Sequence, residues 1–366
     1  MGRKRTKSGK IRLAEVAELA GVSPITASRF FRNPDALSIG KRTRVESAAK
    51  ELGYVPNLAA RALASQRTEV IGVLIPSLTN NVFSDVLRGI YDASEGSRYS
   101  IQLSNTRYSI LQEEKLLRLF LAQKPAGLIV TGIDQTPESR AMLEAADCPI
   151  VQIMEIGPDP VDMMIGFSHH DAARAAVSHL FEQGRRKIGF VGARMDPRVQ
   201  RRLDGYVSAM KDAGSFEQRL VVTTATPTSV TLGGALFTDL LAGEPDLDAV
   251  FCANDDLALG VLFECRRREI AVPEQIAIVG FNDLEFMASA VPTLTSVRTN
   301  RYEMGKTAAT MLIEAIGGQR PEQPVLDLGF KVIERQSSLP RHSDSRPAVS
   351  GAGAVNKMVA LPSSHD

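Results

Sequence analysis

Short apolar runs alternate with amphipathic segments along the chain from Val70 onward. The first set of runs is VIGVLIP, SIQLS, GLIVT and PIVQI, and the second is KIGFVG, DAVFC and IAIVG. Segments with helical periodicity lie between them, at residues 82–97, 109–123, 136–146, 170–183, 198–213, 229–243, 255–268 and 300–317. This order is typical of parallel sheets that carry helices on both faces. We therefore expect an α/β core.

The two sets of runs divide near residue 165, which predicts two similar lobes of parallel, doubly wound sheet. The last helix and the strand near VLDLGF then return to complete the lobes. We expect a core over residues 69–337. Its first lobe spans about 69–165 and 298–325, and its second lobe about 166–297 and 326–337. This architecture resembles that of periplasmic sugar-binding proteins.

The N-terminal segment differs from this core in its charge. Residues 1–67 hold 14 Lys and Arg against 5 Asp and Glu, whereas the remaining residues hold 29 and 37. The formal net charge of +1 therefore conceals a basic segment followed by an acidic remainder. A basic segment attracts polyanions, and nucleic acid is the commonest of these. A solvated basic tail is the alternative interpretation.

Residues 11–55 predict a compact all-α domain with a helix-turn-helix. Apolar residues repeat at helical spacing from Leu13 to Ala20, and Gly21 ends that helix. Ser23 is a typical N-cap and Pro24 suits the first position of a second helix. A third amphipathic segment runs from about Lys41 to Leu52. Residues 1–10 and 338–366 have the composition of disordered tails.

The outward face of the second helix carries side chains suited to DNA. Ile25 and Arg29 lie four residues apart and so point the same way. The first turn of a recognition helix meets base edges, while hydroxyls and arginine reach phosphate or guanine. The candidate DNA contacts on this helix are Ser23, Pro24, Ile25, Thr26, Ser28 and Arg29.

The stretch GYVPNLAARALASQRT, residues 53–68, predicts a hinge helix over residues 56–68. Its apolar residues, among them Leu58 and Leu63, have no core of their own. Pairing with the same helix of a second copy would bury them.

Residues 12–68 resemble the DNA-binding head and hinge of the lactose/galactose repressor family, and the resemblance extends over residues 11–337. Within that family the chain is most similar to gluconate repressors, through SRFFRNPDALS, VIGVLIPSLTNNVFSDVLRGI, FCANDDLALG and VLDLGF. The resemblance implies that Leu63 wedges into the minor groove of the operator. A core or dimer contact is the alternative for Leu63. It also implies that Tyr54 and Asn57 contact the DNA backbone.

The recognition helix departs from the family pattern at two positions. The family offers polar side chains in the first turn, whereas here Pro24 and Ile25 stand there. Neither side chain can form a hydrogen bond, so base recognition there would use apolar contacts such as those with thymine methyl groups.

Ligands of doubly wound sheets bind beyond the carboxyl ends of the strands. Polar, charged and aromatic side chains follow the strands here, including SLTNNVF after the first strand and FSHHD between the lobes. The position after the first strand makes Asn81 a candidate ligand residue, and the family resemblance implies an effector pocket lined by Phe83, Asp171, Arg202, Asn254 and Asn282. For three of these an ordinary structural role is the alternative: Phe83 as a core aromatic, Asn254 as a helix cap, and Arg202 as a solvated charge.

Asn282 stands where the family often has an aspartate. A neutral amide removes one negative charge from the pocket, which favours an anionic effector such as gluconate, a keto-gluconate or another sugar acid. Arg202 could then form a bidentate pair with the carboxylate.

Catalytic and metal-binding patterns are missing from the sequence. It contains no phosphate-binding loop, no dinucleotide fingerprint and no nucleophile elbow. His169 and His170 are adjacent and so point apart, which is typical of a polar surface loop rather than a metal pair. We therefore expect neither an enzyme nor a bound metal or cofactor.

Three further features bear on the location and assembly of the chain. Cys148, Cys252 and Cys265 lack metal-ligand spacing and are typical of reduced thiols. No secretory signal or membrane span is recognisable, which favours the cytoplasm and association with the nucleoid. The C-terminal tail lacks leucine heptads, so we expect a homodimer that binds a pseudo-palindromic site.

Together these features predict a transcription factor, most simply a repressor that a sugar-acid effector releases from its operator. The alternatives are a sugar-binding protein without regulatory function, a sugar-modifying enzyme fused to a DNA-binding head, and a corepressor-dependent regulator that responds to a neutral sugar or sugar phosphate.

Overall fold

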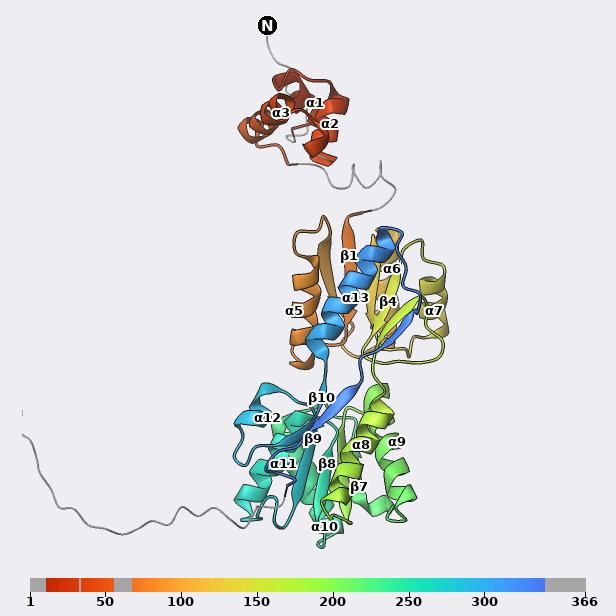
Figure 1. Cartoon of the computed structure of the whole chain (residues 1–366), viewed down its shortest axis with the longest axis vertical. Helices are drawn as coiled ribbons and strands as arrows, with labels where there is room; N and C mark the ends of the chain where they lie inside the picture. Colours follow the sequence, from red (N-terminus) through yellow and green to blue (C-terminus); the bar gives the residue numbers. More distant parts are fainter. Residues whose placement is uncertain (1–10, 33, 56–67, 340–366) are drawn as a thin grey trace, which may run out of the picture. The chain divides into compact units, whose positions relative to one another are not determined.

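The computed structural model describes residues 11–32, 34–55 and 68–339 of the chain. They form a helical head at residues 11–55 and two compact lobes (Figure 1). Lobe N comprises the described residues 68–165 and 302–326, and lobe C comprises residues 166–301 and 327–339. No helix within these residues is both long and apolar enough to cross a bilayer.

The head contains three α-helices, α1 (Leu13–Leu19), α2 (Pro24–Arg32) and α3 (Ile39–Leu52), with a short 3₁₀ turn at Pro34–Ala36. Gly21 has a φ of 61°, and the amide of Val22 donates back to the carbonyl of Ala17 over 3.0 Å. This left-handed residue ends α1 and turns the chain into α2. The predicted helix-turn-helix is confirmed.

Small side chains form the core of the head. Val16, Ala17, Ala20, Ala27, Val45 and Ala48 are buried, and Phe30, Phe31 and Tyr54 pack against them. The alanines leave little bulk between α1 and α2, so the two helices can approach closely. The buried core of the head is built from small side chains, and most of the outer face of α2 lies in solvent.

Lobe N is built on a six-stranded sheet in the order β11-β5-β4-β3-β1-β2. The strands are β1 (Val70–Ile75), β2 (Ser100–Asn105), β3 (Gly127–Thr131), β4 (Ile150–Ile153), β5 (Met163–Gly166) and β11 (Val325–Asp327). The pairs from β2 through β1, β3 and β4 to β5 are parallel. The helices are α5 (Val82–Ser94), α6 (Ile110–Ala122), α7 (Pro137–Glu144) and α13 (Arg301–Ile316).

Glycine lets α5 and α13 pack in close contact. A Cβ added at Gly89 would lie 2.2 Å from the carbonyl oxygen of Tyr302, and one at Gly305 would lie 1.9 Å from that of Val86. Any other residue at these two positions would push the helices apart.

Lobe C repeats the design with the strand order β12-β10-β9-β8-β6-β7. The strands are β6 (Ile188–Ala193), β7 (Val221–Thr224), β8 (Ala249–Cys252), β9 (Ala277–Asn282), β10 (Thr295–Thr299) and β12 (Phe330–Ile333). The helices are α8 (His169–Glu182), α9 (Pro197–Asp212), α10 (Val230–Gly243), α11 (Asp255–Arg267) and the short α12 (Glu285–Ser289). A short 3₁₀ turn at Gln218–Leu220 precedes β7.

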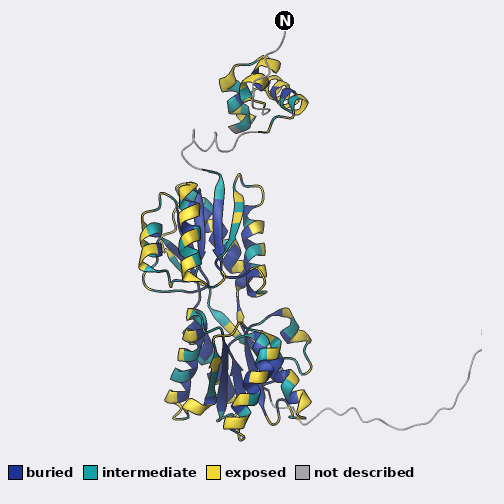
Figure 2. Ribbon diagram, turned by 180° about the vertical axis from the view of Figure 1, so that it is seen from behind, coloured by how far each residue is buried: buried dark blue, intermediate teal, exposed yellow. Residues whose placement is uncertain are grey.

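Burial follows the same plan in both lobes, since the central strands are buried, the edge strands are partly exposed and the helices expose their outer faces (Figure 2). The predicted α/β core and all eight predicted helical segments are confirmed. The expected parallel arrangement is confirmed as the dominant one, and β12 departs from it, because β12 runs antiparallel to β10. The chain enters β12 from lobe N and not through a crossover helix. The strand–helix–strand connection that makes neighbouring strands parallel is therefore missing between β10 and β12.

Candidate DNA-binding and ligand-binding sites

The helix α2 presents its first turn to solvent. The side chain of Ser23 accepts a hydrogen bond from the amide of Thr26 at 3.2 Å, which caps the helix as predicted. The hydroxyls of Ser23 and Thr26 also lie 2.9 Å apart and share a hydrogen bond. Pro24 and Arg29 are exposed, while Ser28 is half-buried.

Ile25 is the most unusual residue of this face, because 69% of it is exposed. Two residues further on, Ala27 is fully buried against the core of the head. Packing within the head therefore does not explain an isoleucine at position 25. An exposed apolar side chain in the first turn of a helix can contact the methyl group of thymine in the major groove.

The remaining predicted DNA contacts lie at or beyond the end of α3. The ring of Tyr54 is half-buried and packs on that of Phe31, with centroids 5.4 Å apart. Gly53 ends α3 with a φ of 61° and directs the chain toward the predicted hinge. Asn57 and Leu63 lie outside the described residues, as do residues 56–67 of the predicted hinge helix and residues 1–10 and 340–366 of the predicted tails. The prediction of a disordered tail was wrong at Ser338, which is fully buried and lies 2.7 Å from Nε2 of His179.

The carboxyl edge of the sheet in lobe C gathers contacts around Arg202. This residue comes from α9, and its guanidinium carbon lies 3.8 Å from the centroid of the Phe281 ring. Its Nε donates to Nδ1 of His169 at 3.1 Å, and its Nη1 donates to the carbonyl of Ala253. Arg202 is only 6% exposed, so it is not the solvated surface charge that sequence reasoning left open.

Asn254 and Asn282 each stand next to a residue that contacts Arg202. Asn254 follows Ala253, accepts a hydrogen bond from the amide of Leu257, and so caps α11. Its amide nitrogen also donates to Thr228 at 3.1 Å. Asn282 follows Phe281, is 3% exposed, and has a φ of 114°. The capping role considered for Asn254 is therefore real, and the same side chain still lies at the edge where ligands of such sheets bind.

The two adjacent histidines in the first turn of α8 differ in their burial. His169 is fully buried, whereas His170 is half-buried and donates to the carboxylate of Asp171 at 2.9 Å. That hydrogen bond lowers the pKa of the Asp171 carboxyl below its ordinary value. The expectation of a polar surface loop was wrong for His169. The helix begins at that residue, so the 100° step between neighbours turns one ring inward and the other outward.

Two of the predicted ligand residues lie in lobe N, at the start of α5. Asn81 is exposed at the N-cap position, and Phe83 is 2% exposed inside the lobe. Asn80, not Asn81, makes the local contacts: its oxygen accepts from the amide of Val82 at 3.0 Å and its nitrogen donates to the hydroxyl of Tyr108 at 3.0 Å. Sequence reasoning missed Tyr108, which follows β2 in a polar stretch.

Left-handed backbone marks the carboxyl edges of both sheets. Pairs of consecutive non-glycine residues with positive φ follow or end three strands: Arg107–Tyr108 after β2, Arg194–Met195 after β6, and Asn282–Asp283 at β9. Such conformations are costly for residues with a side chain and tend to cluster at functional sites. The sequence gives no direct signal for them.

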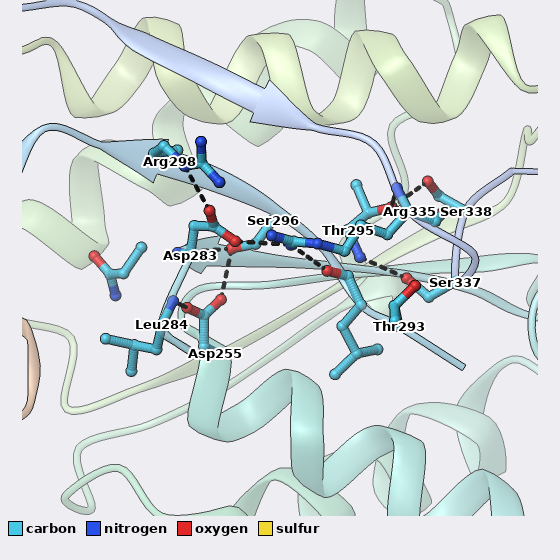
Figure 3. Close-up of polar contacts among 12 residues, drawn as sticks. Asp255, Asp283, Leu284, Thr293, Thr295, Ser296, Arg298, Arg335, Ser337 and Ser338 are labelled. Atoms are coloured by element: carbon cyan, nitrogen blue, oxygen red, sulfur yellow. Dashed lines mark hydrogen bonds and ion pairs between the residues drawn. The ribbon is translucent and has the colours of Figure 1, made fainter. Parts of the chain in front are cut away.

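Two aspartates with buried side chains, Asp255 and Asp283, brace this edge of lobe C (Figure 3). Asp255 accepts from the hydroxyl of Ser296 at 2.6 Å and from the amide of Leu284 at 2.7 Å. Asp283 forms ion pairs of 2.7 Å with both Arg298 and Arg335. Burial raises the pKa of Asp255 to about 6. Both aspartates follow a predicted strand in the sequence, and each adjoins a predicted ligand residue.

No group of three or more His, Cys, Asp or Glu side chains could hold a metal ion within the residues that the structure describes. Cys252 and Cys265 are buried, and burial raises the pKa of both thiols.

Two parts of the chain match known protein families. Residues 12–57 match the family of bacterial regulatory proteins of the lacI type, and residues 177–338 match the periplasmic binding protein-like domain. The HTH-type transcriptional regulator GntR of Pseudomonas aeruginosa is 42% identical to this chain over 331 residues. The match covers 90% of this chain and 96% of that protein.

Solved structures agree with these matches. A LacI-family transcriptional regulator from Silicibacter pomeroyi is 34% identical with a TM-score of 0.84, and the match covers 90% of this chain and all of that one. The lac repressor dimer bound to operator and the anti-inducer ONPF is 25% identical with a TM-score of 0.78, over 90% of this chain and all of that one. The protein is therefore a DNA-binding transcriptional regulator, not an enzyme, and it belongs to the LacI family of bacterial regulatory proteins.

Proposed function

We propose that this protein is a cytoplasmic repressor of genes for sugar-acid metabolism. A homodimer binds a pseudo-palindromic operator through two heads, and a gluconate-like anion releases it. Two hinges, with Leu63 as the minor-groove wedge, complete the DNA contact. A relative, the lac repressor, is a dimer on its operator, which supports the dimeric part of the proposal.

The exposed face of α2 supports the DNA half of the proposal. Ser23, Thr26 and Ser28 supply hydroxyls for phosphate oxygens, and Arg29 supplies a guanidinium for phosphate or guanine. Pro24 and Ile25 make apolar contacts with base edges, and Ile25 selects thymine through its methyl group. Tyr54 and Asn57 hold the DNA backbone at the far end of the head. The excess of Lys and Arg in residues 1–67 adds affinity that falls with rising salt.

The buried guanidinium of Arg202 carries the effector half of the proposal. A buried cation is costly unless an anion or strong acceptors compensate it. Arg202 donates to a histidine nitrogen and to a backbone carbonyl, and its charge also interacts with the carboxylate of Asp196. Asn282 is neutral, at the position where the family often has an aspartate. A ligand carboxylate would add a further negative charge, with the planar bidentate geometry that guanidinium prefers.

The other ligand residues suit a polyol chain. Asn254, Asn282 and Asn81 offer amides that both donate to and accept from hydroxyl groups, and Asp171 offers a carboxylate acceptor. Phe83 is 2% exposed inside lobe N, as its alternative role of a core aromatic requires, and any contact with the ligand would be through its ring. An anionic head beside a row of hydroxyls is the chemistry of gluconate and keto-gluconates.

The experiment is an operator-binding titration with the full chain and DNA from upstream of its own gene. Gluconate and 2-keto-gluconate should weaken binding, whereas glucose and glucose 6-phosphate should not. Arg29→Ala should abolish operator binding, and Arg202→Ala should keep it but lose the response to gluconate. Arg186→Ala is the matched control, because Arg186 is exposed beyond the opposite end of β6.

Each unfavourable result points to one part of the proposal. Absence of operator binding at low salt would refute the DNA half. A response to neutral sugars or sugar phosphates alone would refute the anionic effector, and tighter binding with ligand would indicate a corepressor.

A further inference from the structure

We infer that His169 is a positioning residue that holds the guanidinium of Arg202 in a fixed plane for carboxylate recognition. The inference rests on the proposed function of Arg202. It concerns a residue that touches the arginine rather than the effector.

Arg202 is held by contacts from three separate elements of lobe C. Phe281 at the end of β9 lies under the guanidinium, with 3.8 Å between the guanidinium carbon and the ring centroid. Ala253 after β8 accepts from Nη1, and His169 at the start of α8 accepts from Nε at 3.1 Å. A stacking face and two in-plane hydrogen bonds together determine the orientation of a planar group.

The hydrogen bond to His169 also determines the protonation of its ring. The Nε–H of arginine can only donate, because a guanidinium has no acceptor. Nδ1 of His169 must therefore be unprotonated, and the neutral ring carries its proton on Nε2. A doubly protonated His169 would place two cations and two opposed N–H groups 3.1 Å apart.

The surroundings of His169 leave the ring little freedom to turn away. The residue is fully buried. Its ring centroid lies 4.4 Å from that of Phe167 and 5.7 Å from that of Phe281, and the latter pair is stacked. The same Phe281 ring thus supports both partners of the hydrogen bond. An arginine held in this way loses little side-chain entropy when a carboxylate binds, which favours anionic over neutral ligands.

The test uses an isosteric pair of variants, His169→Asn and His169→Leu, in the full chain. Both lose the imidazole ring and its packing, but asparagine keeps an acceptor near the position of Nδ1. Isothermal titration with gluconate should give an affinity close to wild type for His169→Asn. His169→Leu should bind about 10- to 100-fold more weakly, the range for a lost hydrogen bond to a charged group.

Two further readouts separate positioning from general damage. Operator affinity without effector should stay within about twofold for wild type and both variants, a change of under 0.5 kcal/mol. The preference for gluconate over glucose should collapse only in His169→Leu. Equal gluconate affinities for the two variants, or wild-type affinity for His169→Leu, would overturn the inference.

A measurement without effector separates this inference from the proposed function. Solvent exchange of the Arg202 Nε–H, followed by ¹⁵N NMR, should be slow in wild type and His169→Asn and fast in His169→Leu. If wild type binds no sugar acid but shows this pattern, the proposed effector is wrong and the positioning role stands. Equal exchange in all three proteins would refute the positioning role itself.

Discussion

The outer face of α2 and the carboxyl edge of lobe C carry the two candidate sites, and they hold their side chains in opposite ways. Ile25 and Arg29 are exposed and stand on a small head whose buried core contains only valine and alanine. Arg202 and Asn282 are buried, and each is tied to neighbouring elements by hydrogen bonds or ring stacking. The DNA face thus depends on exposed shape and charge, whereas the ligand edge is built into the packing of the lobe.

Substitutions on the DNA face should therefore affect function but hardly stability, whereas substitutions at the ligand edge of lobe C should affect both. A substitution on the DNA face removes contacts with a partner and few contacts within the protein. A substitution at the ligand edge also leaves a buried polar group without its partner, which costs stability as well as binding.

Asp283→Ala should have the largest effect on stability. The Asp283 side chain is 4% exposed and forms ion pairs with Arg298 and Arg335, of which Arg335 is 13% exposed. Removing the carboxylate leaves the Arg335 charge buried and uncompensated, which costs about 3–5 kcal/mol. Urea unfolding followed by circular dichroism should show this loss in the unfolding of lobe C.

Asp212→Ala is the control for that prediction. Asp212 pairs with Arg174 at 2.6 Å, but both side chains are largely exposed. An exposed pair contributes about 0–1 kcal/mol, so this variant should unfold nearly as wild type does. Similar losses for the two variants would contradict the claim that burial makes the ligand edge costly to disturb.

Asp255 should make lobe C more stable in mild acid than at neutral pH. Burial raises the pKa of Asp255 to about 6 in the folded protein, against about 3.9 when unfolded. At a pH between these two values, the folded state therefore keeps a proton on Asp255 that the unfolded state has lost. Stability from this group is full below pH 4 and is lost as the pH rises through 6, by roughly 3 kcal/mol in total.

Asp255→Asn tests this dependence, because asparagine does not titrate. The free energy of unfolding of both proteins is measured in urea from pH 4 to 8. Relative to the variant, wild type should lose roughly 3 kcal/mol of stability as the pH rises over this range. A difference that stays constant across the range would show that Asp255 ionises at its ordinary pKa.

Ser23→Ala should have a smaller effect, confined to the head. The Ser23 hydroxyl caps α2 through the amide of Thr26, and losing such a cap costs about 1 kcal/mol. Amide hydrogen exchange of α2 in the full chain should quicken by roughly fivefold, while exchange in lobe C stays unchanged. Ser23→Asp keeps a capping acceptor and should restore protection, and unaltered exchange in Ser23→Ala would show that the cap is idle.

Ile25→Ala should change stability least, by at most about 0.5 kcal/mol, because the side chain is 69% exposed. Its effect should appear on DNA instead, as a loss of about 1 kcal/mol in operator affinity with little change in binding to unrelated DNA. Competition titrations with both duplexes measure the two affinities. A marked loss of head stability without a change in operator affinity would place Ile25 in the core rather than on the DNA face.

The fold was largely predictable from sequence because its signals are local. Apolar runs such as VIGVLI and helix ends such as Ser23–Pro24 and Gly53 predicted most elements. β5 (Met163–Gly166) is a short apolar run that was missed, whereas two other missed strands lack a continuous apolar run. β7 (Val221–Thr224) ends in two threonines at a half-exposed edge, and β10 (Thr295–Thr299) has valine as its only apolar residue, although most of the strand is buried.

The site was less predictable because it depends on contacts between distant segments. Sequence position shows that Arg202 follows a strand, but not that Phe281 lies beneath it or that His169 turns inward to accept its Nε–H. The ion pairs of Asp283 join β9 to residues 15 and 52 positions further along the chain. No local pattern encodes such pairings.

Gluconate titrated into the full chain, with and without saturating operator duplex, tests the central claim most directly. Linkage requires that the operator weakens gluconate binding by the same factor by which gluconate weakens operator binding, typically about 5- to 150-fold. The account predicts this reciprocal loss in wild type and its absence in Arg202→Ala. Equal gluconate affinities with and without operator in wild type, while the heads still bind DNA tightly, would contradict it.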